Sequence, residues 1–313
     1  MVKGMSKRRL ISFDWAMKKL LRSKANFEIL EGFFSELIKE NITILDILES
    51  ESNKELSADK FNKVDLKVKN QNNEIIIIEV QYEREFDYLQ RILYGTSKVI
   101  TEHIHENEPY SKVVKVISVN ILYFDLGLGS DYVYHGSTSF IGLHNHDQLQ
   151  LSIEQQELYQ KDQIQKIFPE YYLIKVNNFN DIAKDKLDEW IYFLKNEEIK
   201  ADFNAKGLKK AQLELDILKL PEQERQAYER YQDDRHYQAS MVESSYTVGH
   251  QKGLKEGIKE GIKEGIKNGV VEGEKQKSLE IAKNLIGLLD TEVIAIKTGL
   301  SIEEVKAIEK DNI

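Results

Sequence analysis

The residues with the clearest chemical potential are two acids and an amide: Asp65, Glu79 and Gln81. Glu79 and Gln81 end the stretch EIIIIEVQY, residues 74–82, in which four consecutive isoleucines run directly into polar side chains. A strand that is buried along its whole length would continue with apolar residues. Side chains two residues apart on a strand point to the same face. We therefore expect a strand that is buried at its start and opens into a polar site at its end.

A hairpin would bring Asp65 to this site. The segment 63–70 also has the pattern of a strand, and only QNN separates it from the isoleucine strand, which favours a tight turn. Pairing Asn70 with Glu74 places Asp65 opposite Glu79. The same register gathers six apolar residues on one face: Val64, Leu66, Val68, Ile76, Ile78 and Val80.

Two carboxylates placed directly opposite each other on neighbouring strands repel, so a cation is expected between them. Mg²⁺ suits such a pair because it is held by one or two carboxylates, with water and phosphate completing its shell. Mn²⁺ is the alternative ion. The competing interpretation is structural: Asp65 would pair with Lys63 or Lys67, and Glu79 and Gln81 would mark an exposed strand end.

The periodicity predicts the elements that must position these residues. Helices are expected over 13–22, over 26–40 behind Asn26, and over 85–106; strands are expected over 42–50, 63–70, 74–82 and 112–124. The order is helix, three strands, helix, strand. The stretches DYVYHGSTSF, LQLSI and YYLIKV are further strand candidates. Beyond about residue 180 the pattern is charged and helical, and Pro221 ends one helix and starts another.

Asp65, a hairpin and Glu79-Val80-Gln81, set in an αβββαβ order, resemble the PD-(D/E)XK nuclease superfamily in its variant with glutamine at the motif lysine. FDWAMKKLLR, NFEILEGFFSEL, DKFNKVDLKV and IIIIEVQYEREFDYLQRILYG are similar to the Rpn family of recombination-promoting nucleases and transposases. This resemblance covers residues 12 to about 150, and the glycine repeats of the tail are also similar. It implies an α/β fold with a restriction-endonuclease-like core, in which a mixed sheet is flanked by helices, and a C-terminal helical extension.

The resemblance also implies Mg²⁺-dependent hydrolysis of DNA phosphodiester bonds in recombination, transposition or mobile elements. Asp65 and Glu79 would be the metal ligands, and Gln81 would orient water without supplying charge. Many members add a glutamate from the first core helix, for which we choose Glu31 over Glu28 and Glu36. Neutral Gln81 and the acidic chain leave a second hypothesis open: a catalytically weak or inactive module that keeps the nuclease fold and binds DNA or proteins.

A basic N-terminal segment offers a surface for DNA phosphates, although the whole chain carries a net charge of −9. Lys18, Lys19 and Arg22 are the candidates there, and Arg91 on the helix over 85–106 is a fourth. For Arg91 the alternative is a salt bridge to Glu85 or Asp87. Eight basic residues and one acid, Asp14, fall within residues 1–24: Lys3, Lys7, Arg8, Arg9, Lys18, Lys19, Arg22 and Lys24.

The tail contains a four-residue repeat with glycine at 249, 253, 257, 261, 265, 269 and 273. On a helix these glycines would form a slowly drifting stripe, and we expect the chain to form homo-oligomers through this helical tail. The alternative is a spacer of marginal helicity. Near the C-terminus, Ala295, Gly299 and Val305 have helix-turn-helix spacing, but the acidic second helix argues against base reading.

The remaining features bound the class of protein. We divide the chain into a nuclease-like domain over 1–178, a helical extension over 179–246, the glycine repeat over 247–275 and a small helical segment over 276–313. The chain has no cysteine and no apolar run near the roughly 20 residues of a membrane span. Asp14 and Lys18 interrupt any signal-peptide pattern. We expect a cytoplasmic protein that does not bind membranes. His103, His105, His144 and His146 are weak metal candidates.

Overall fold

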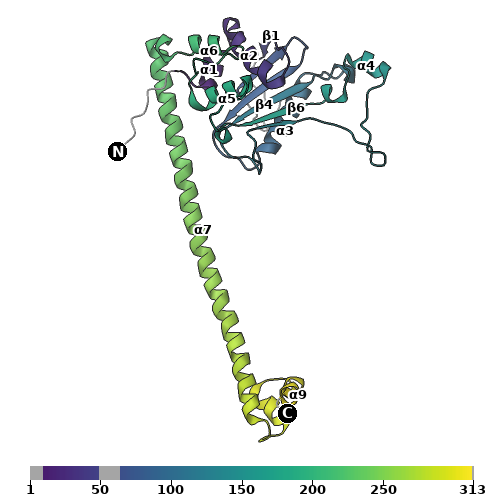
Figure 1. Cartoon of the computed structure of the whole chain (residues 1–313), viewed down its shortest axis with the longest axis vertical. Helices are drawn as coiled ribbons and strands as arrows, with labels where there is room; N and C mark the ends of the chain where they lie inside the picture. Colours follow the sequence, from purple (N-terminus) through teal and green to yellow (C-terminus); the bar gives the residue numbers. More distant parts are fainter. Residues whose placement is uncertain (1–9, 49–63, 312–313) are drawn as a thin grey trace. The chain divides into compact units, whose positions relative to one another are not determined.

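The structure is a computed structural model that describes residues 10–48 and 64–311 (Figure 1). It divides into two compact units, Met1–His236 and Tyr237–Ile313. Within the described residues, no helix is both long enough and apolar enough to cross a membrane. The predicted boundary at residue 178 falls inside the first unit, because Phe179, Trp190 and Phe193 belong to the same buried core as the sheet.

A mixed six-stranded sheet organises the first unit, with the strand order β1-β2-β3-β4-β6-β5. The strands are β1 (Ile44–Leu48), β2 (Leu66–Asn70), β3 (Ile75–Gln81), β4 (Val116–Leu122), β5 (Val133–Gly136) and β6 (Glu170–Lys175). The pairs β3–β4 and β4–β6 are parallel, and the other three pairs are antiparallel. The chain therefore has the predicted α/β class, with a mixed sheet flanked by helices.

Helices cover both faces of this sheet (Figure 1). The α-helices of the first unit are α1 (Phe13–Lys19), α2 (Phe27–Ile38), α3 (Tyr88–Glu102), α4 (Ile153–Tyr159), α5 (Lys186–Asn196), α6 (Leu208–Glu214) and the start of α7 (Glu222–Leu285). Short 3₁₀ turns occur at Lys24–Asn26, Tyr110–Lys112, Ile164–Lys166, Val176–Asn178 and Ile217–Lys219. The main core joins α1, α2, α5 and α6 to one face, and α3 packs on the other. This two-sided burial explains the unbroken isoleucine run of β3.

The predicted hairpin register is confirmed. Leu66 pairs with Ile78 and Lys69 pairs with Ile75, and the Asn70 N–H donates to the Glu74 carbonyl at 3.0 Å. Five of the six apolar residues expected on one face contact the main core: Leu66, Val68, Ile76, Ile78 and Val80.

The prediction for Val64 is wrong, because this residue packs on the opposite face with Ile77 and Val99. The regular ladder of β2 begins only at Leu66. Beyond the ladder, the backbone N–H of Val80 donates to the side chain of Asp65 at 2.8 Å rather than to a backbone carbonyl of the neighbouring strand. Since the alternation of faces holds only within the ladder, it does not reach Val64.

Another predicted strand is absent from the structure. DYVYHGSTSF and YYLIKV contain β5 and β6, but LQLSI, residues 149–153, forms no strand. Its Ser152 instead caps α4: the Ser152 hydroxyl accepts from the Gln155 N–H, and the Gln155 side chain accepts from the Ser152 N–H. This capping box competes with a strand for the same residues.

The second unit contains the rest of α7 followed by α8 (Thr291–Thr298) and α9 (Ile302–Asp311). Gly299 ends α8 with a φ of 71°, a left-handed conformation that favours glycine. Ala295 and Val305 are buried together in a small core with Ala282 and Ile294. The helix-turn-helix shape predicted from Ala295, Gly299 and Val305 is therefore confirmed.

Candidate active site

Asp65 and Glu79 lie next to each other where the β2–β3 hairpin opens. The Asp65 backbone N–H donates to the carbonyl of Ile78 at 3.1 Å, one residue out of the ladder register in which Ile78 pairs with Leu66. Its carboxylate oxygen Oδ2 accepts the backbone N–H of Val80, the residue directly after Glu79. The hairpin thus brings together two acids that are separated by a turn in the sequence.

Glu79 is buried, with 7% of the residue exposed, and forms an ion pair with Arg91 of α3. Burial raises its pKa from 4.5 to about 7, because a charged carboxylate loses its hydration. The ion pair with Arg91 lowers the pKa but only partly offsets burial, and the negative charge of Asp65 raises it further. Glu79 is therefore a carboxylate for which an additional cation would be favourable.

Glu85 connects Gln81 to Arg91. The Gln81 amide nitrogen Nε2 donates to Glu85 Oε1 at 3.0 Å and to the Glu83 carbonyl at 3.2 Å. Arg91 Nη1 lies 2.5 Å from the same Glu85 oxygen. The salt bridge that was the alternative for Arg91 is thus present, and it extends to Glu79. In the sequence Glu85 stood out only as a partner for Arg91, and its contact with Gln81 had no separate signal.

Basic residues of α1 and of the turn that follows it border the acidic pair on its other side. Lys18 Nζ lies 3.4 Å from Asp65 Oδ1, and Arg22 Nη2 donates to the Asp65 carbonyl at 3.1 Å. Lys19 is exposed on the same segment. Lys67, one of the partners considered for Asp65, pairs instead with Glu102 at 3.3 Å. Lys63 and the basic residues before Leu10 lie outside the described residues.

Glu31 is not brought to this site. Its Oε1 accepts the backbone N–H of Ile44 at 2.8 Å, at the start of β1. Ile44 pairs with Asn70, the end of β2 that is farthest from Asp65. The carboxylate of Glu31 thus satisfies a strand terminus at the opposite end of the sheet.

The donor set fits a metal held by two carboxylates. No cluster of three or more histidine, aspartate or glutamate side chains that could hold a metal occurs among the described residues, and this includes the four histidines considered above. Asp65 and Glu79 each already face a cationic side chain, Lys18 and Arg91 respectively. The two carboxylates therefore lie where positive charge is favourable. Mg²⁺ prefers oxygen ligands and is typically held by one or two carboxylates, so the pair fits this ion.

Comparison with known protein families identifies the family of this chain. Residues 11–245 match the family model described as PD-(D/E)XK nuclease family transposase. The chain belongs to this family. Searches of curated proteins and of solved structures returned no match. The match extends beyond the sheet into α7, so the family region includes the helices after β6 as well as the acidic pair.

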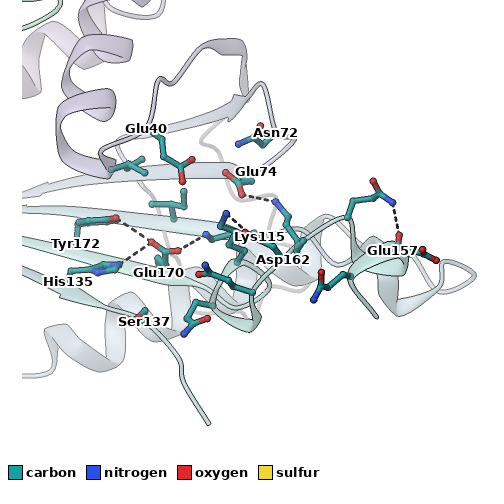
Figure 2. Close-up of a pocket in the computed structure, with 18 of the residues that line it drawn as sticks. Glu40, Asn72, Glu74, Lys115, His135, Ser137, Glu157, Asp162, Glu170 and Tyr172 are labelled. Carbon is teal, nitrogen blue, oxygen red and sulfur yellow. Dashed lines mark hydrogen bonds and ion pairs between the residues drawn. The ribbon is translucent and has the colours of Figure 1, made fainter. Parts of the chain in front are cut away.

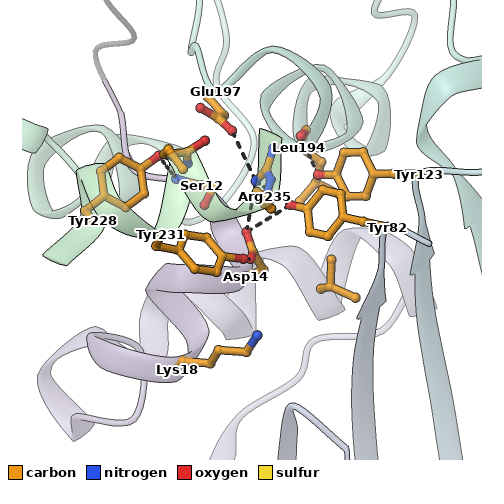
Figure 3. Close-up of polar contacts among 12 residues, drawn as sticks. Ser12, Asp14, Lys18, Tyr82, Tyr123, Leu194, Glu197, Tyr228, Tyr231 and Arg235 are labelled. Atoms are coloured by element: carbon orange, nitrogen blue, oxygen red, sulfur yellow. Dashed lines mark hydrogen bonds and ion pairs between the residues drawn. The ribbon is translucent and has the colours of Figure 1, made fainter. Parts of the chain in front are cut away.

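In this PD-(D/E)XK family chain, a buried polar network ties the start of α7 to α1 (Figure 3). The Asp14 carboxylate accepts from the Tyr82 hydroxyl at 3.0 Å and from the Tyr231 hydroxyl. Arg235 donates to Tyr82 at 2.9 Å and lies 3.8 Å from Asp14. Tyr82 directly follows Gln81, and Lys18 lies one helical turn after Asp14. The network therefore positions the two elements that flank the candidate site, a role that the sequence pattern did not indicate.

A separate cavity of about 840 Å³ lies at the other end of the strands (Figure 2). It is lined by charged pairs: Glu74 with Lys161 at 3.0 Å, and Lys115 with Glu170 at 2.5 Å. Glu74 precedes β3 and Glu170 begins β6, whereas Glu79 and Gln81 lie at the end of β3. This cavity is therefore distinct from the candidate site at Asp65 and Glu79.

Proposed function

We propose that this chain is a Mg²⁺-dependent DNA endonuclease that acts in recombination or transposition. One observation carries the proposal: Asp65 accepts the N–H of Val80, the residue after Glu79, so the two acids lie near each other at the open end of the hairpin, with Lys18, Arg22 and Arg91 around them. Family membership supports a nuclease-related role. Acidic ligands next to basic side chains suit a substrate that is a phosphate diester.

Asp65 and Glu79 would hold the divalent cation through their carboxylate oxygens, with water and DNA phosphate completing the shell. A bound Mg²⁺ or Mn²⁺ supplies a Lewis acid that polarises the phosphate and lowers the pKa of a water molecule. The buried position of Glu79 keeps one ligand rigid. The Val80 N–H holds the Asp65 carboxylate in place.

Gln81 would orient the attacking water. Its Nε2 is used by Glu83 and Glu85, so its side-chain oxygen is directed away from them and can accept a hydrogen bond from water. Lys18, Lys19 and Arg22 would bind the DNA backbone on the α1 side, where positive charge favours phosphate. Arg91 would bind the scissile phosphate when the cation takes over part of the charge of Glu79.

A second candidate function is a DNA-binding or protein-binding module with little or no turnover. Two observations favour it: Gln81 cannot supply a positive charge to the transition state, and each carboxylate is already paired with Lys18 or Arg91. In this module the acids would have a structural role, and their replacement would weaken the fold rather than a reaction.

Cleavage of supercoiled plasmid by the full chain in Mg²⁺, Mn²⁺ or EDTA tests these alternatives. We expect metal-dependent nicking by the natural chain. The nicking rate should fall at least about 100-fold in each single variant, Asp65→Asn and Glu79→Gln, because each removes one charged metal ligand with almost no change in side-chain size. Glu102→Gln is the matched control, since it removes a carboxylate that pairs with Lys67 away from the site. DNA binding measured in parallel, with no cleavage in any metal, would favour the module instead.

A further inference from the structure

The glycine repeat of α7 carries a row of exposed apolar side chains. Leucine, isoleucine or valine follows each glycine from 253 to 269, and each of these side chains is between 54% and 64% exposed. They are Leu254, Ile258, Ile262, Ile266 and Val270. Among the described residues, none of positions 249–273 belongs to a buried cluster. An unbroken apolar row of this length on a surface marks an interaction site.

This part of α7 needs a partner for its own stability. Each glycine in a helix costs up to about 1 kcal/mol relative to alanine, and seven glycines fall within residues 249–273. Most helical stability in proteins comes from packing of an apolar face. The only apolar face here is the exposed row, so a neighbouring helix is the natural source of the missing stability.

The four positions of the repeat form four rows on the helix surface. Successive residues are rotated by about 100°, so the rows follow one another around the helix as glycine, isoleucine, lysine and glutamate. The isoleucine row is a ridge, and the adjacent glycine row is a groove. A Cβ atom built at any of these glycines would meet no atom within 4 Å.

We propose that this surface binds the same surface of a second copy of the chain in a parallel pair. In parallel helices the rows turn in the same sense, so a two-fold axis along them places the isoleucine ridge of each copy in the glycine groove of the other. It also places the lysine row, Lys255, Lys259 and Lys263, opposite the glutamate row, Glu256, Glu260 and Glu264. The repeat is therefore complementary to itself in shape and charge.

An antiparallel pair has none of these advantages. Reversing one helix reverses the order of its rows, which sets isoleucine against isoleucine, glycine against glycine and lysine against lysine. Like charges would then face each other along both borders, and the grooves would remain unfilled. The order of residue types within the repeat thus selects the parallel orientation.

The geometry also limits the length of the contact. A row repeating every four residues drifts by about 40° per repeat on a straight helix, so two rows stay in register for two or three repeats. Packing of such ridges crosses the helices at about −50°. The contact is centred on Ile258, Ile262 and Gly261, in the middle of the repeat. This inference is independent of the nuclease activity.

Sedimentation equilibrium of the full chain tests the pairing, and we expect twice the mass of one chain. The triple variant Gly257→Gln, Gly261→Gln and Gly265→Gln fills the groove with polar side chains but improves helix propensity. We expect its dimer dissociation constant to rise at least about 100-fold while helix content by circular dichroism is kept or increased. The matched control, Glu229→Gln, Asp233→Asn and Asp234→Asn, changes three exposed positions of α7 outside the repeat and should remain dimeric. A monomeric natural chain, or a triple glycine variant that stays dimeric, would overturn the proposal.

Spin labels test the orientation, which is straightforward because the chain has no cysteine. Single variants Gln251→Cys and Glu274→Cys mark the two ends of the repeat. In a parallel pair, the label on one chain lies near the same label on the other chain. In an antiparallel pair the two labels of either variant are separated by about 35 Å along the axis, since each residue rises 1.5 Å. Distances that long in both variants would contradict the parallel arrangement.

Discussion

Arg91 of α3 forms an ion pair with Glu79 of β3, and the same guanidinium contacts Glu85 at 2.5 Å. The Glu79 carboxylate proposed to hold a metal is therefore already paired with a cation. Two cations sharing one carboxylate repel each other, so Arg91 should affect metal binding and the chemical step in opposite directions.

Replacement of Arg91 by glutamine should separate these two effects. We expect the Mg²⁺ concentration for half-maximal cleavage to fall about three- to ten-fold, because a competing positive charge is removed. The single-turnover rate should fall about 10- to 100-fold, because the phosphate loses a cationic contact. Cleavage under metal titration measures both quantities. Arg225→Gln, which removes a guanidinium paired with Glu222 on α7, is the control and should change neither.

Glu79 should make stability decrease as the pH rises from about 4.5 to about 7. Within this window the folded protein keeps a proton on Glu79 that the unfolded chain has released, because burial raises the folded pKa to about 7. The contribution to the free energy of unfolding falls by about 1.4 kcal/mol per pH unit, or roughly 3 kcal/mol in all. Above pH 7 both states have lost the proton and the contribution is constant.

Urea denaturation of the natural chain and of Glu79→Gln, from pH 4.5 to 8, measures this contribution. The difference in unfolding free energy between the two proteins should change with pH in favour of the glutamine variant. Glu229→Gln removes an exposed carboxylate of α7 and serves as the control. A pH-independent difference for Glu79→Gln would show that the Glu79 carboxyl titrates as it does in the unfolded chain.

The hairpin could be predicted from the sequence because its determinants are local. The alternation of apolar residues and the QNN turn predict the register that the structure has from Leu66 to Asn70, and Asp65 follows directly beside the end of β3. Glu31 shows where such reasoning ends. A helical pattern does not reveal which glutamate faces a strand end, and the contact of Glu31 with Ile44 depends on how α2 meets β1.

Asp14 illustrates a second limit. Its charge looked like an interruption of an apolar segment, yet its hydrogen bond with Tyr231 spans 217 residues of sequence. No periodicity within either helix could indicate that contact, since it exists only after α7 packs against α1. The same applies to Asp65, which pairs with Lys18 of α1, whereas its sequence neighbour Lys67 pairs with Glu102.

Gln81→Lys introduces the lysine that the resemblance to the superfamily motif implies at this position. Lysine at position 81 can reach Glu85, which now accepts from the Gln81 amide at 3.0 Å, so the change should be tolerated by the fold. We expect cleavage to increase up to about ten-fold, because a positive charge near the developing phosphorane charge stabilises the transition state. Gln81→Met, similar in size but unable to orient water, should reduce it. If both variants cleave like the natural chain, Gln81 has no role in the reaction.

Asp14→Ala should destabilise the first unit strongly. Asp14 is buried, and its removal leaves the hydroxyls of Tyr82 and Tyr231 and the guanidinium of Arg235 without their shared acceptor. Loss of one partner in a buried charged network costs about 3 kcal/mol, which lowers the melting temperature of a unit of this size by roughly 6 to 12 °C. Asp234→Ala, an exposed position on α7, is the control and should change it by less than about 2 °C. Equal melting temperatures for the two variants would mean that the network does not hold α7 against α1.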